Sequence, residues 1–226
     1  MTTALVIGCD RGIAHAIALQ LHARGDDVIA ACLSDGDDLK QQGIAVEPHV
    51  DVTDGASVTA LAARLRASGT RLDWLLHVAG VLGLDELGAI DYDDVRRQFE
   101  INAVGPLRTV EAHRDLLGPG SKVGIVTSRV GSLGDNTSGG MYAYRISKAA
   151  ANMAGLNLHH DLAKVGVATV MLHPGMVATD LTKDYPGDFV YIQPEEAAAG
   201  LINDMDALTP ETSGRFQHSN GTYLPW

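Results

Sequence analysis

Ala4-Leu5-Val6-Ile7-Gly8-Cys9-Asp10-Arg11-Gly12-Ile13-Ala14 is the stretch of this chain that decides its fold. Its first four residues form an apolar run that predicts a buried strand, and Ile13 to Leu21 then shows the apolar spacing of a helix. Small residues in the turn between them would let the backbone approach a pyrophosphate, with N–H donors at the start of the helix. The spacing of Gly8 and Gly12 is not the commonest one for such turns, so the flanking strand and helix carry the prediction.

The alternation of strand and helix continues along the chain. Apolar runs predict further strands, and helical patterns lie between them. The strands are Val28 to Leu33, Ile44 to Val50, Leu72 to Val78, Lys122 to Thr127 and Val167 to Leu172, and the helices are Gly55 to Ala67, Tyr92 to Leu117 and Tyr142 to Lys164. Such alternation predicts a parallel sheet with helices on both faces. We therefore expect a single doubly wound α/β domain of the Rossmann type over residues 1–226.

Right-handed crossovers place the ligand crevice of such a sheet beyond the carboxyl ends of its strands. Small or polar residues follow several predicted strands there: Gly8, Asp51, Ala79-Gly80, Ser128 and Pro174-Gly175. One crevice could gather all of them, although they are far apart in sequence. Leu181 to Gln193 is polar, contains Gly and Pro and lacks periodicity, so we expect a mobile flap over the crevice.

Composition argues against several classes of protein. The chain has 226 residues and a formal net charge of −11, whereas a nucleic-acid surface needs clustered Lys and Arg. No apolar run approaches the roughly 20 residues of a membrane span, and a first strand near Ala4 leaves no room for a signal peptide. Cys9 and Cys32 lack the spacing of a zinc site or a disulfide framework, and His159-His160-Asp161 has no third ligand at a helical spacing. We therefore expect a cytoplasmic protein with core thiols and no metal.

Tyr144-Arg145-Ile146-Ser147-Lys148 suggests a site of proton transfer. On a helix, Tyr144 and Lys148 project from the same face, so the lysine ammonium could favour the ionised phenol. An ordinary Tyr, with a pKa of roughly 10, would hold its proton too tightly to exchange it near neutral pH. Taken alone, this spacing is common and also fits an ordinary surface pair on a helix.

Seven short motifs follow one another along the chain: the Gly8 turn, Asp51-Val52, Ala79-Gly80, Asn102, Ser128, Tyr144-x-x-x-Lys148 and Pro174 to Thr179. Their order and setting resemble the short-chain dehydrogenase/reductase family, from the first strand to about Asp180. The ending, Gly221 to Trp226, is similar to the carbonyl-reductase branch that includes sniffer and C-factor-like proteins.

The resemblance implies a role for each motif. Tyr144 would donate and accept the proton, Lys148 would lower its pKa and bind the nicotinamide ribose, and Ser128 would hold the substrate oxygen. Asn102 would bend a helix and anchor a water that links Lys148 to solvent. Cofactor contacts would come from Gly8, Asp10, Arg11, Gly12, Ile13, Ser34, Asp51, Val52, Ala79, Gly80, Tyr144, Lys148, Pro174, Gly175, Val177 and Thr179, with Asp51 on the adenine and Thr179 on the nicotinamide carboxamide.

Some of these residues have plainer alternatives. Asn102 could be an ordinary polar group of a helix, and Asp51 and Thr179 could cap local segments. Ser132 competes with Ser128, because the spacing from Ser128 to the tyrosine is longer than the family's commonest one; we choose Ser128 because it directly ends a predicted strand. His77 stands where the family usually has Asn. It could replace that Asn by hydrogen bonding between strands, and we expect it to be a core or strand-end residue that takes no part in catalysis.

The function that the resemblance implies is hydride transfer between a nicotinamide dinucleotide and a small carbonyl or alcohol substrate. NADP(H) is favoured over NAD(H), because Arg11 could pair with a 2′-phosphate and Ser34 could add a hydrogen bond. Asp35, Asp37 and Asp38 oppose this preference unless they point to solvent.

Two alternatives stay open from the sequence. One is a dinucleotide-binding signalling or regulatory protein of the same fold without significant turnover. The other is a nucleotide-sugar epimerase or dehydratase, which the short C-terminal part of the chain disfavours. The long helices Tyr92 to Leu117 and Tyr142 to Lys164 could pair across a two-fold axis, so we also expect a homodimer or homotetramer.

Overall fold

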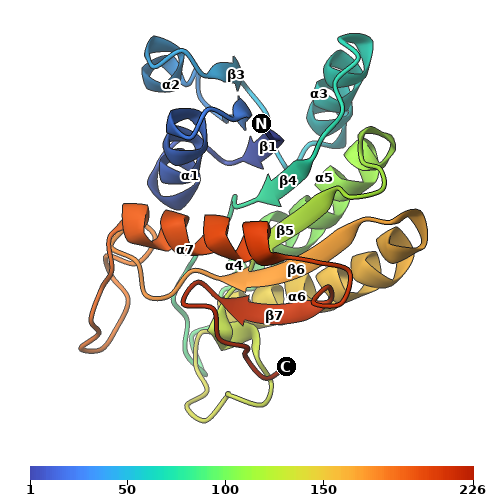
Figure 1. Cartoon of the computed structure of the whole chain (residues 1–226). Coiled ribbons are helices and arrows are strands. Elements are labelled where there is room, and N and C mark those ends of the chain that lie inside the picture. Colours follow the sequence, from blue (N-terminus) through green and yellow to red (C-terminus); the bar gives the residue numbers. More distant parts are fainter.

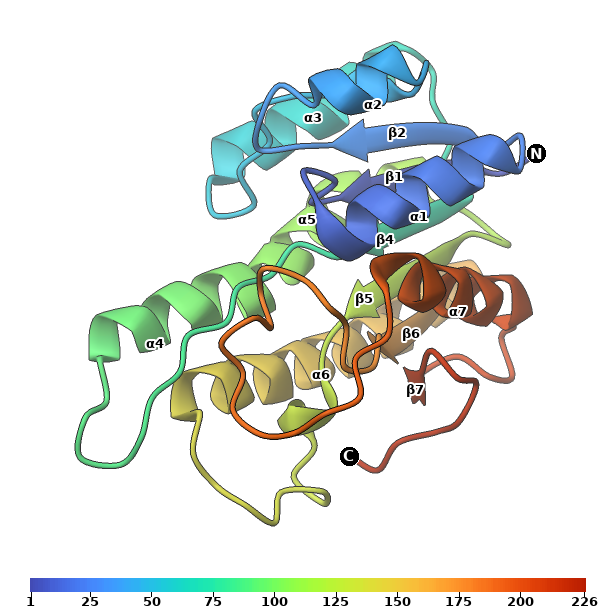
Figure 2. The same cartoon turned by 90° about the vertical axis from the view of Figure 1, so that its left-hand side faces the viewer.

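A seven-stranded parallel sheet lies between two layers of helices in the computed structural model, which describes residues 1–226 (Figures 1 and 2). The strand order is β3-β2-β1-β4-β5-β6-β7, as expected for a doubly wound sheet. The strands are β1 (Thr3–Ile7), β2 (Asp27–Ala31), β3 (Ala45–Glu47), β4 (Trp74–His77), β5 (Lys122–Val126), β6 (Ala168–His173) and β7 (Arg215–His218). The predicted fold class is confirmed.

Seven α-helices cover the sheet: α1 (Gly12–Ala23), α2 (Asp37–Gln41), α3 (Gly55–Ala67), α4 (Tyr92–Phe99), α5 (Gly105–His113), α6 (Tyr142–Leu162) and α7 (Pro194–Ala207). A π-helical turn, η1 (Glu100–Val104), joins α4 to α5, and three short 3₁₀ segments are η2 (Arg114–Leu116), η3 (Arg129–Gly131) and η4 (Ala163–Val165). The helical stretch predicted from Tyr92 to Leu117 is therefore interrupted at η1. None of the helices has the length and apolarity needed to cross a bilayer.

Successive residues of each strand point to opposite faces of the sheet, so the hydrophobic core has two parts, one on each face. In β1, Ala4 and Val6 pack with α1, α2 and α7 on one face of the sheet, whereas Leu5 and Ile7 pack with α3, α5 and α6 on the other. All four side chains are almost fully buried, which explains why the strand reads as a continuous apolar run. The two cysteines are free thiols and are buried in the first of these cores.

The last part of the fold was not predicted from the sequence. Helix α7 packs against α1, and β7 extends the sheet beside β6. Only Phe216 of the four β7 residues is buried, so no apolar run marks this strand. Residues 181–193 contain no helix or named strand, and an isolated parallel bridge pairs Ile192 with Val177 in the segment that follows β6. The mobility expected for this segment stays a prediction.

Candidate active site

Two adjoining cavities lie at the carboxyl ends of the strands. The larger, with a volume of about 710 Å³, is lined by Gly8, Arg11, Ser34 and Asp51 among others, and we call it the glycine-turn cavity. The smaller, of about 410 Å³, is lined by Ser128, Tyr144 and Lys148 among others, and we call it the tyrosine cavity. Ile13, Gly80 and Thr179 belong to both cavities, so one continuous cleft crosses this edge of the sheet.

The glycine turn is shaped for a close backbone approach. Gly8 has a φ of +95°, and a Cβ at this position would lie 2.8 Å from Cα of Ala79 at the end of the neighbouring strand. Gly12 begins α1, and Arg11 before it provides no side-chain cap to the helix. The first N–H groups of α1 therefore have no capping side chain and face the cavity as donors for an anion. These features fit the pyrophosphate of a dinucleotide.

Asp10 ties the glycine turn to the end of β2. Its carboxylate accepts hydrogen bonds from the backbone N–H groups of Leu33, at 2.9 Å, and Ser34, at 2.7 Å. Burial alone would raise the pKa of Asp10, but these hydrogen bonds outweigh it and hold the pKa below its ordinary value. Asp51 accepts hydrogen bonds from the N–H and hydroxyl of Thr53, so it shapes a local turn and also lines the cavity.

Tyr144 and Lys148 project from α6 into the tyrosine cavity. The Nζ atom of Lys148 lies 5.7 Å from the centre of the Tyr144 ring and donates a hydrogen bond to the carbonyl of Val126 at 3.2 Å. Tyr144 is 7% exposed and Lys148 is 3% exposed. The two side chains therefore share one buried site, as the spacing of four residues predicted.

Burial sets the pKa of both groups. It raises the pKa of Tyr144 well above the ordinary value, while a hydrogen bond from Ser128 acts in the opposite direction. It also lowers the pKa of Lys148 to about 8. The direction for Tyr144 is opposite to the one expected from the sequence, because loss of water around the phenolate outweighs the neighbouring cation. That Lys148 lowers the pKa of Tyr144 during the reaction therefore stays a proposal.

Ser128 lies in the tyrosine cavity and Ser132 does not line it. Ser128 follows β5 directly, and its hydroxyl also accepts a weak hydrogen bond from the N–H of Val130 at 3.4 Å. Ser132 is 1% exposed, and its hydroxyl accepts a hydrogen bond from the N–H of Asp135 at 3.1 Å. The geometry therefore supports Ser128 over Ser132.

Asn102 lies behind this cavity, in the π-helical turn η1. Its side chain exchanges two hydrogen bonds with the backbone of Val81, both at 2.9 Å, and donates to the hydroxyl of Ser147 at 2.9 Å. A Cβ at Gly80 would lie 3.1 Å from Oδ1 of Asn102 and 3.4 Å from Nζ of Lys148. The absence of a side chain at Gly80 thus lets Asn102 and Lys148 lie close to the end of β4.

All of the residues predicted to bind the cofactor line one of the two cavities. Gly8, Asp10, Arg11, Gly12, Ser34, Asp51, Val52 and Ala79 line the glycine-turn cavity, Tyr144, Lys148, Pro174, Gly175 and Val177 line the tyrosine cavity, and Ile13, Gly80 and Thr179 line both. Asn102 lines neither.

His77 ends β4 and is buried, as expected, but the hydrogen bonding suggested for it is not formed. His77 is 1% exposed, and neither of its ring nitrogens has a hydrogen-bond partner. His77 lies in β4, which pairs with β1 on one side and β5 on the other, so its ring is enclosed by the core. Burial lowers the pKa of His77 to about 3, so the ring is neutral.

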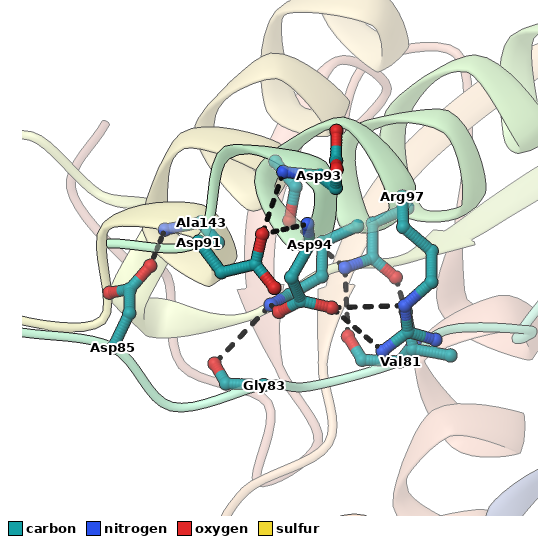
Figure 3. Close-up of polar contacts among 11 residues, drawn as sticks. Val81, Gly83, Asp85, Asp91, Asp93, Asp94, Arg97 and Ala143 are labelled. Carbon is teal, nitrogen blue, oxygen red and sulfur yellow. Dashed lines mark hydrogen bonds and ion pairs between the residues drawn. The ribbon is translucent and has the colours of Figure 1, made fainter. Parts of the chain in front are cut away.

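Several residues of the site were missed. His173 and His218 line the tyrosine cavity with ring centres 4.7 Å apart, but His218 belongs to the unpredicted strand β7. Asp85 accepts hydrogen bonds from the N–H groups of Tyr142 and Ala143 at the start of α6. Figure 3 shows the bond to Ala143. Arg145, between the two predicted residues of α6, also lines the cavity. Of these residues, only Arg145 lies within a motif of the sequence, between Tyr144 and Lys148, that could have indicated its place in the site.

The family model described as short chain dehydrogenase matches residues 2–188, so the chain belongs to the short-chain dehydrogenase family. It is 70% identical over 226 residues to 1-hydroxy-2-glutathionyl-2-methyl-3-butene dehydrogenase of Rhodococcus sp. (strain AD45), with both chains covered completely. It is also 46% identical over 158 residues to C-signal of Myxococcus xanthus, covering 69% of this chain and 93% of the relative. The chain is therefore an NAD(P)-dependent short-chain dehydrogenase.

Solved structures agree with this assignment. The NADPH-bound carbonyl reductase from chicken fatty liver matches with a TM-score of 0.91 and 26% identity, covering 100% of this chain and 99% of the other. The resemblance to the carbonyl-reductase branch of the family is therefore confirmed.

Proposed function

We propose that this chain oxidises the primary alcohol of a glutathione conjugate to the aldehyde, with a nicotinamide dinucleotide as the hydride acceptor. The observation that carries this proposal is the 70% identity, over the full length of both chains, to a dehydrogenase named for 1-hydroxy-2-glutathionyl-2-methyl-3-butene. In that compound the hydroxyl carbon is the neighbour of the carbon that bears the sulfur. The cavity around Tyr144 then has to accept a small branched alcohol with a long polar substituent.

In this proposal Ser128 and Tyr144 both hold the hydroxyl oxygen of the substrate. The hydroxyl proton passes to Oη of the ionised Tyr144 as the carbinol hydrogen leaves as a hydride, so the C–O single bond becomes a carbonyl. The ammonium of Lys148 lies 5.7 Å from the centre of the Tyr144 ring, and its charge favours the ionised form of Tyr144. Asn102 holds the end of β4 beside Lys148 through its hydrogen bonds to Val81. The reverse reaction, reduction of a carbonyl, uses the same groups.

The coenzyme would lie along the cleft, with its pyrophosphate at the glycine turn and its nicotinamide near Tyr144. The acidic residues that opposed NADP(H) in the sequence are exposed and paired: Asp35 with His49 at 3.2 Å, Asp37 with Lys40 at 3.2 Å and Asp38 with His15 at 2.5 Å. Arg11 lines the cavity and approaches Asp180 only at 3.7 Å, so its charge is loosely paired. This supports NADP(H), which the chicken-liver carbonyl reductase also binds.

One charge acts against a 2′-phosphate. Asp10 occupies the N–H groups of Leu33 and Ser34 and places a carboxylate beside the hydroxyl that was expected to help bind that phosphate. We therefore propose that the site accepts both coenzymes and that NADP(H) is preferred by less than about tenfold, since one loosely paired Arg contributes about 1 kcal/mol or less.

The test is a spectrophotometric assay of coenzyme reduction with 1-hydroxy-2-glutathionyl-2-methyl-3-butene. A panel of simple alcohols without the glutathionyl group provides the comparison. We expect the conjugate to be oxidised with the highest kcat/KM of the panel. A higher kcat/KM for a simple alcohol, or no turnover of the conjugate, would reject the substrate assignment.

A second candidate is signalling, because the chain is 46% identical to C-signal over 158 residues. In that case the protein would bind a dinucleotide and have no significant turnover. Binding of coenzyme without turnover of any alcohol or aldehyde in the panel would favour this candidate.

We also propose a homodimer or homotetramer. Exposed apolar side chains lie on the neighbouring helices α4 and α6, namely Phe99, which is 40% exposed, Ile146, which is 48% exposed, and Met153, which is 60% exposed. Covering them would remove apolar surface from water. Light scattering coupled to size-exclusion chromatography tests this, and a mass of one chain would reject it.

A further inference from the structure

Arg145 is a half-buried cation of the tyrosine cavity that has no carboxylate partner in the chain. Its guanidinium donates only to neutral acceptors: the carbonyl of Gly140 at 3.1 Å, the carbonyl of Val130 at 3.2 Å and the hydroxyl of Ser138 at 2.9 Å. Arg129, the other arginine of this cavity, differs because it pairs with Asp135 at 2.7 Å. Of the two arginines of this cavity, Arg145 is therefore the one whose charge has no carboxylate partner.

The remaining donors of Arg145 suit a carboxylate. A guanidinium carries five N–H groups, and the three hydrogen bonds use the one on Nε and one on each terminal nitrogen. One N–H on each terminal nitrogen is left without a partner. Arginine binds carboxylates through two parallel N–H donors, and such charge-assisted bonds are stronger than bonds between neutral groups.

Arg145 also lies close to the flap. Tyr185 and Phe189 of that segment line the same cavity as Arg145. A substituent of the substrate that extends from the reaction centre between α6 and residues 181–193 would pass the guanidinium of Arg145.

We propose that Arg145 binds a carboxylate of the glutathionyl group and thereby sets specificity for anionic thioether alcohols. This inference rests on the proposed function. The glutathionyl sulfur is one carbon away from the carbon that is oxidised, so the peptide has to leave through the cavity that holds Tyr144, the residue before Arg145. Glutathione carries two carboxylates and one ammonium, and its net negative charge at pH 7 complements an unneutralised guanidinium.

The first experiment compares two alcohols that differ only in charge and size of the sulfur substituent: 1-hydroxy-2-glutathionyl-2-methyl-3-butene and the analogue with S-methyl in place of the glutathionyl group. With saturating coenzyme, Arg145→Gln should lower kcat/KM for the conjugate about tenfold to hundredfold and change that for the S-methyl analogue less than about threefold. The matched control is Arg114→Gln, which removes an exposed positive charge that has no carboxylate partner and lies outside both cavities. It should leave both values unchanged.

Equal loss for both alcohols would mean that Arg145 only holds the loop that contains Val130, Ser138 and Gly140, and would overturn the inference. No loss for either would overturn it as well. Arg145→Lys keeps the charge without the paired donors and should retain part of the preference for the conjugate.

A change on the substrate provides a second measurement that leaves the protein intact. Converting one carboxylate of the conjugate to a carboxamide should lower kcat/KM for the wild type, and the same conversion should have little effect in Arg145→Gln. The two carboxylates are tested separately, and the inference fails if both amides lose as much in the variant as in the wild type.

Binding of S-methylglutathione to the protein with bound coenzyme, followed by calorimetry, separates this inference from the proposed function. It needs no turnover. Binding that is weakened about tenfold or more in Arg145→Gln supports the subsite even if neither alcohol is oxidised, which would reject the proposed function alone. Equal binding by wild type and variant, or no binding by either, would reject the subsite.

Discussion

Asp85 caps the helix that carries Tyr144 by accepting a hydrogen bond from the N–H of Ala143 at 2.9 Å (Figure 3). The same carboxylate accepts from the N–H of Tyr142, and the carbonyl of Asp85 accepts from the N–H of Met141. Met141, the residue before the helix, has a φ of +49° and provides no side-chain cap. A residue 58 positions before Ala143 therefore satisfies the first two N–H groups of α6.

Asp85→Ala should lower both stability and activity. Loss of a helix cap costs about 1 kcal/mol, which corresponds to a fall in Tm of roughly 2–4 °C for a protein of this size. Because Tyr144 is the third residue of α6, fraying of this end should also lower kcat. Asp85→Asn keeps an acceptor oxygen and should retain most of both properties. Thermal unfolding and steady-state kinetics test this, and an Asp85→Ala variant with unchanged Tm and kcat would show that the cap has no such role.

The proposed general base gives the second prediction. Tyr144→Phe removes the hydroxyl that exchanges the proton and leaves the ring in place, so turnover should fall by at least about a hundredfold. The glycine turn is untouched, and the Kd of the coenzyme should change less than about threefold. A fluorescence titration of coenzyme binding checks the second value. Turnover near the wild-type level would reject the role of Tyr144.

Much of the sheet could be predicted from the sequence because its central strands are buried on both faces. β1 is apolar in nearly every residue, so the pattern itself marks it. β7 could not be predicted, since it holds its place through backbone pairing with β6 and buries only Phe216. Tyr144 and Lys148 lie close together, as predicted, because residues four apart on one helix project from the same face.

Other parts of the site depend on tertiary contacts and burial, which the spacing of residues in the sequence does not predict. The hydrogen bonds of Asp85 to α6 join segments that are distant in the sequence, and no local pattern marks them. His77 lies in a strand whose position was predicted, yet the absence of a partner for its ring follows from packing alone. The direction of the pKa shift of Tyr144 also depends on burial, which the spacing to Lys148 could not provide.

The pH dependence of alcohol oxidation should follow the ionisation of Tyr144. Because burial raises the pKa of this phenol, only a small fraction is ionised near neutral pH, and kcat/KM should increase as the pH rises from 6 to about 8, by about tenfold per pH unit at most. Burial lowers the pKa of Lys148 to about 8, so its charge is lost above that pH and the rise should become shallower. In Lys148→Ala the nearby cation is lost, so the rise should move to higher pH and the KM of the coenzyme should increase. A profile identical to that of the wild type would show that Lys148 does not influence the ionisation of Tyr144.

Two substitutions should move the coenzyme preference in opposite directions. Arg11→Ala removes the cation available to a 2′-phosphate and should weaken NADPH binding relative to NADH. Asp10→Asn removes a negative charge beside Ser34 while keeping an acceptor for a backbone N–H, so it should strengthen NADPH relative to NADH. Each change should be about twofold to tenfold in the ratio of the two Kd values. A wild-type preference for NADPH beyond about tenfold, or a preference for NADH, would contradict the weak preference for NADP(H) proposed above.

Asp204 should make the stability of the fold depend on pH. This carboxylate on α7 accepts a hydrogen bond from Gln217 at 2.6 Å, but its second oxygen is buried without a partner, and burial raises its pKa to about 6. The unfolded chain loses this proton near pH 4, so between about pH 4 and pH 6 the folded state binds more protons and its stability falls as the pH rises.

Asp204→Asn removes the buried charge and can still accept from Gln217. Its Tm should therefore exceed that of the wild type above about pH 7, and the two should converge below about pH 4. Thermal unfolding measured from pH 4 to 8 tests this, and a constant difference in Tm over that range would reject the assignment.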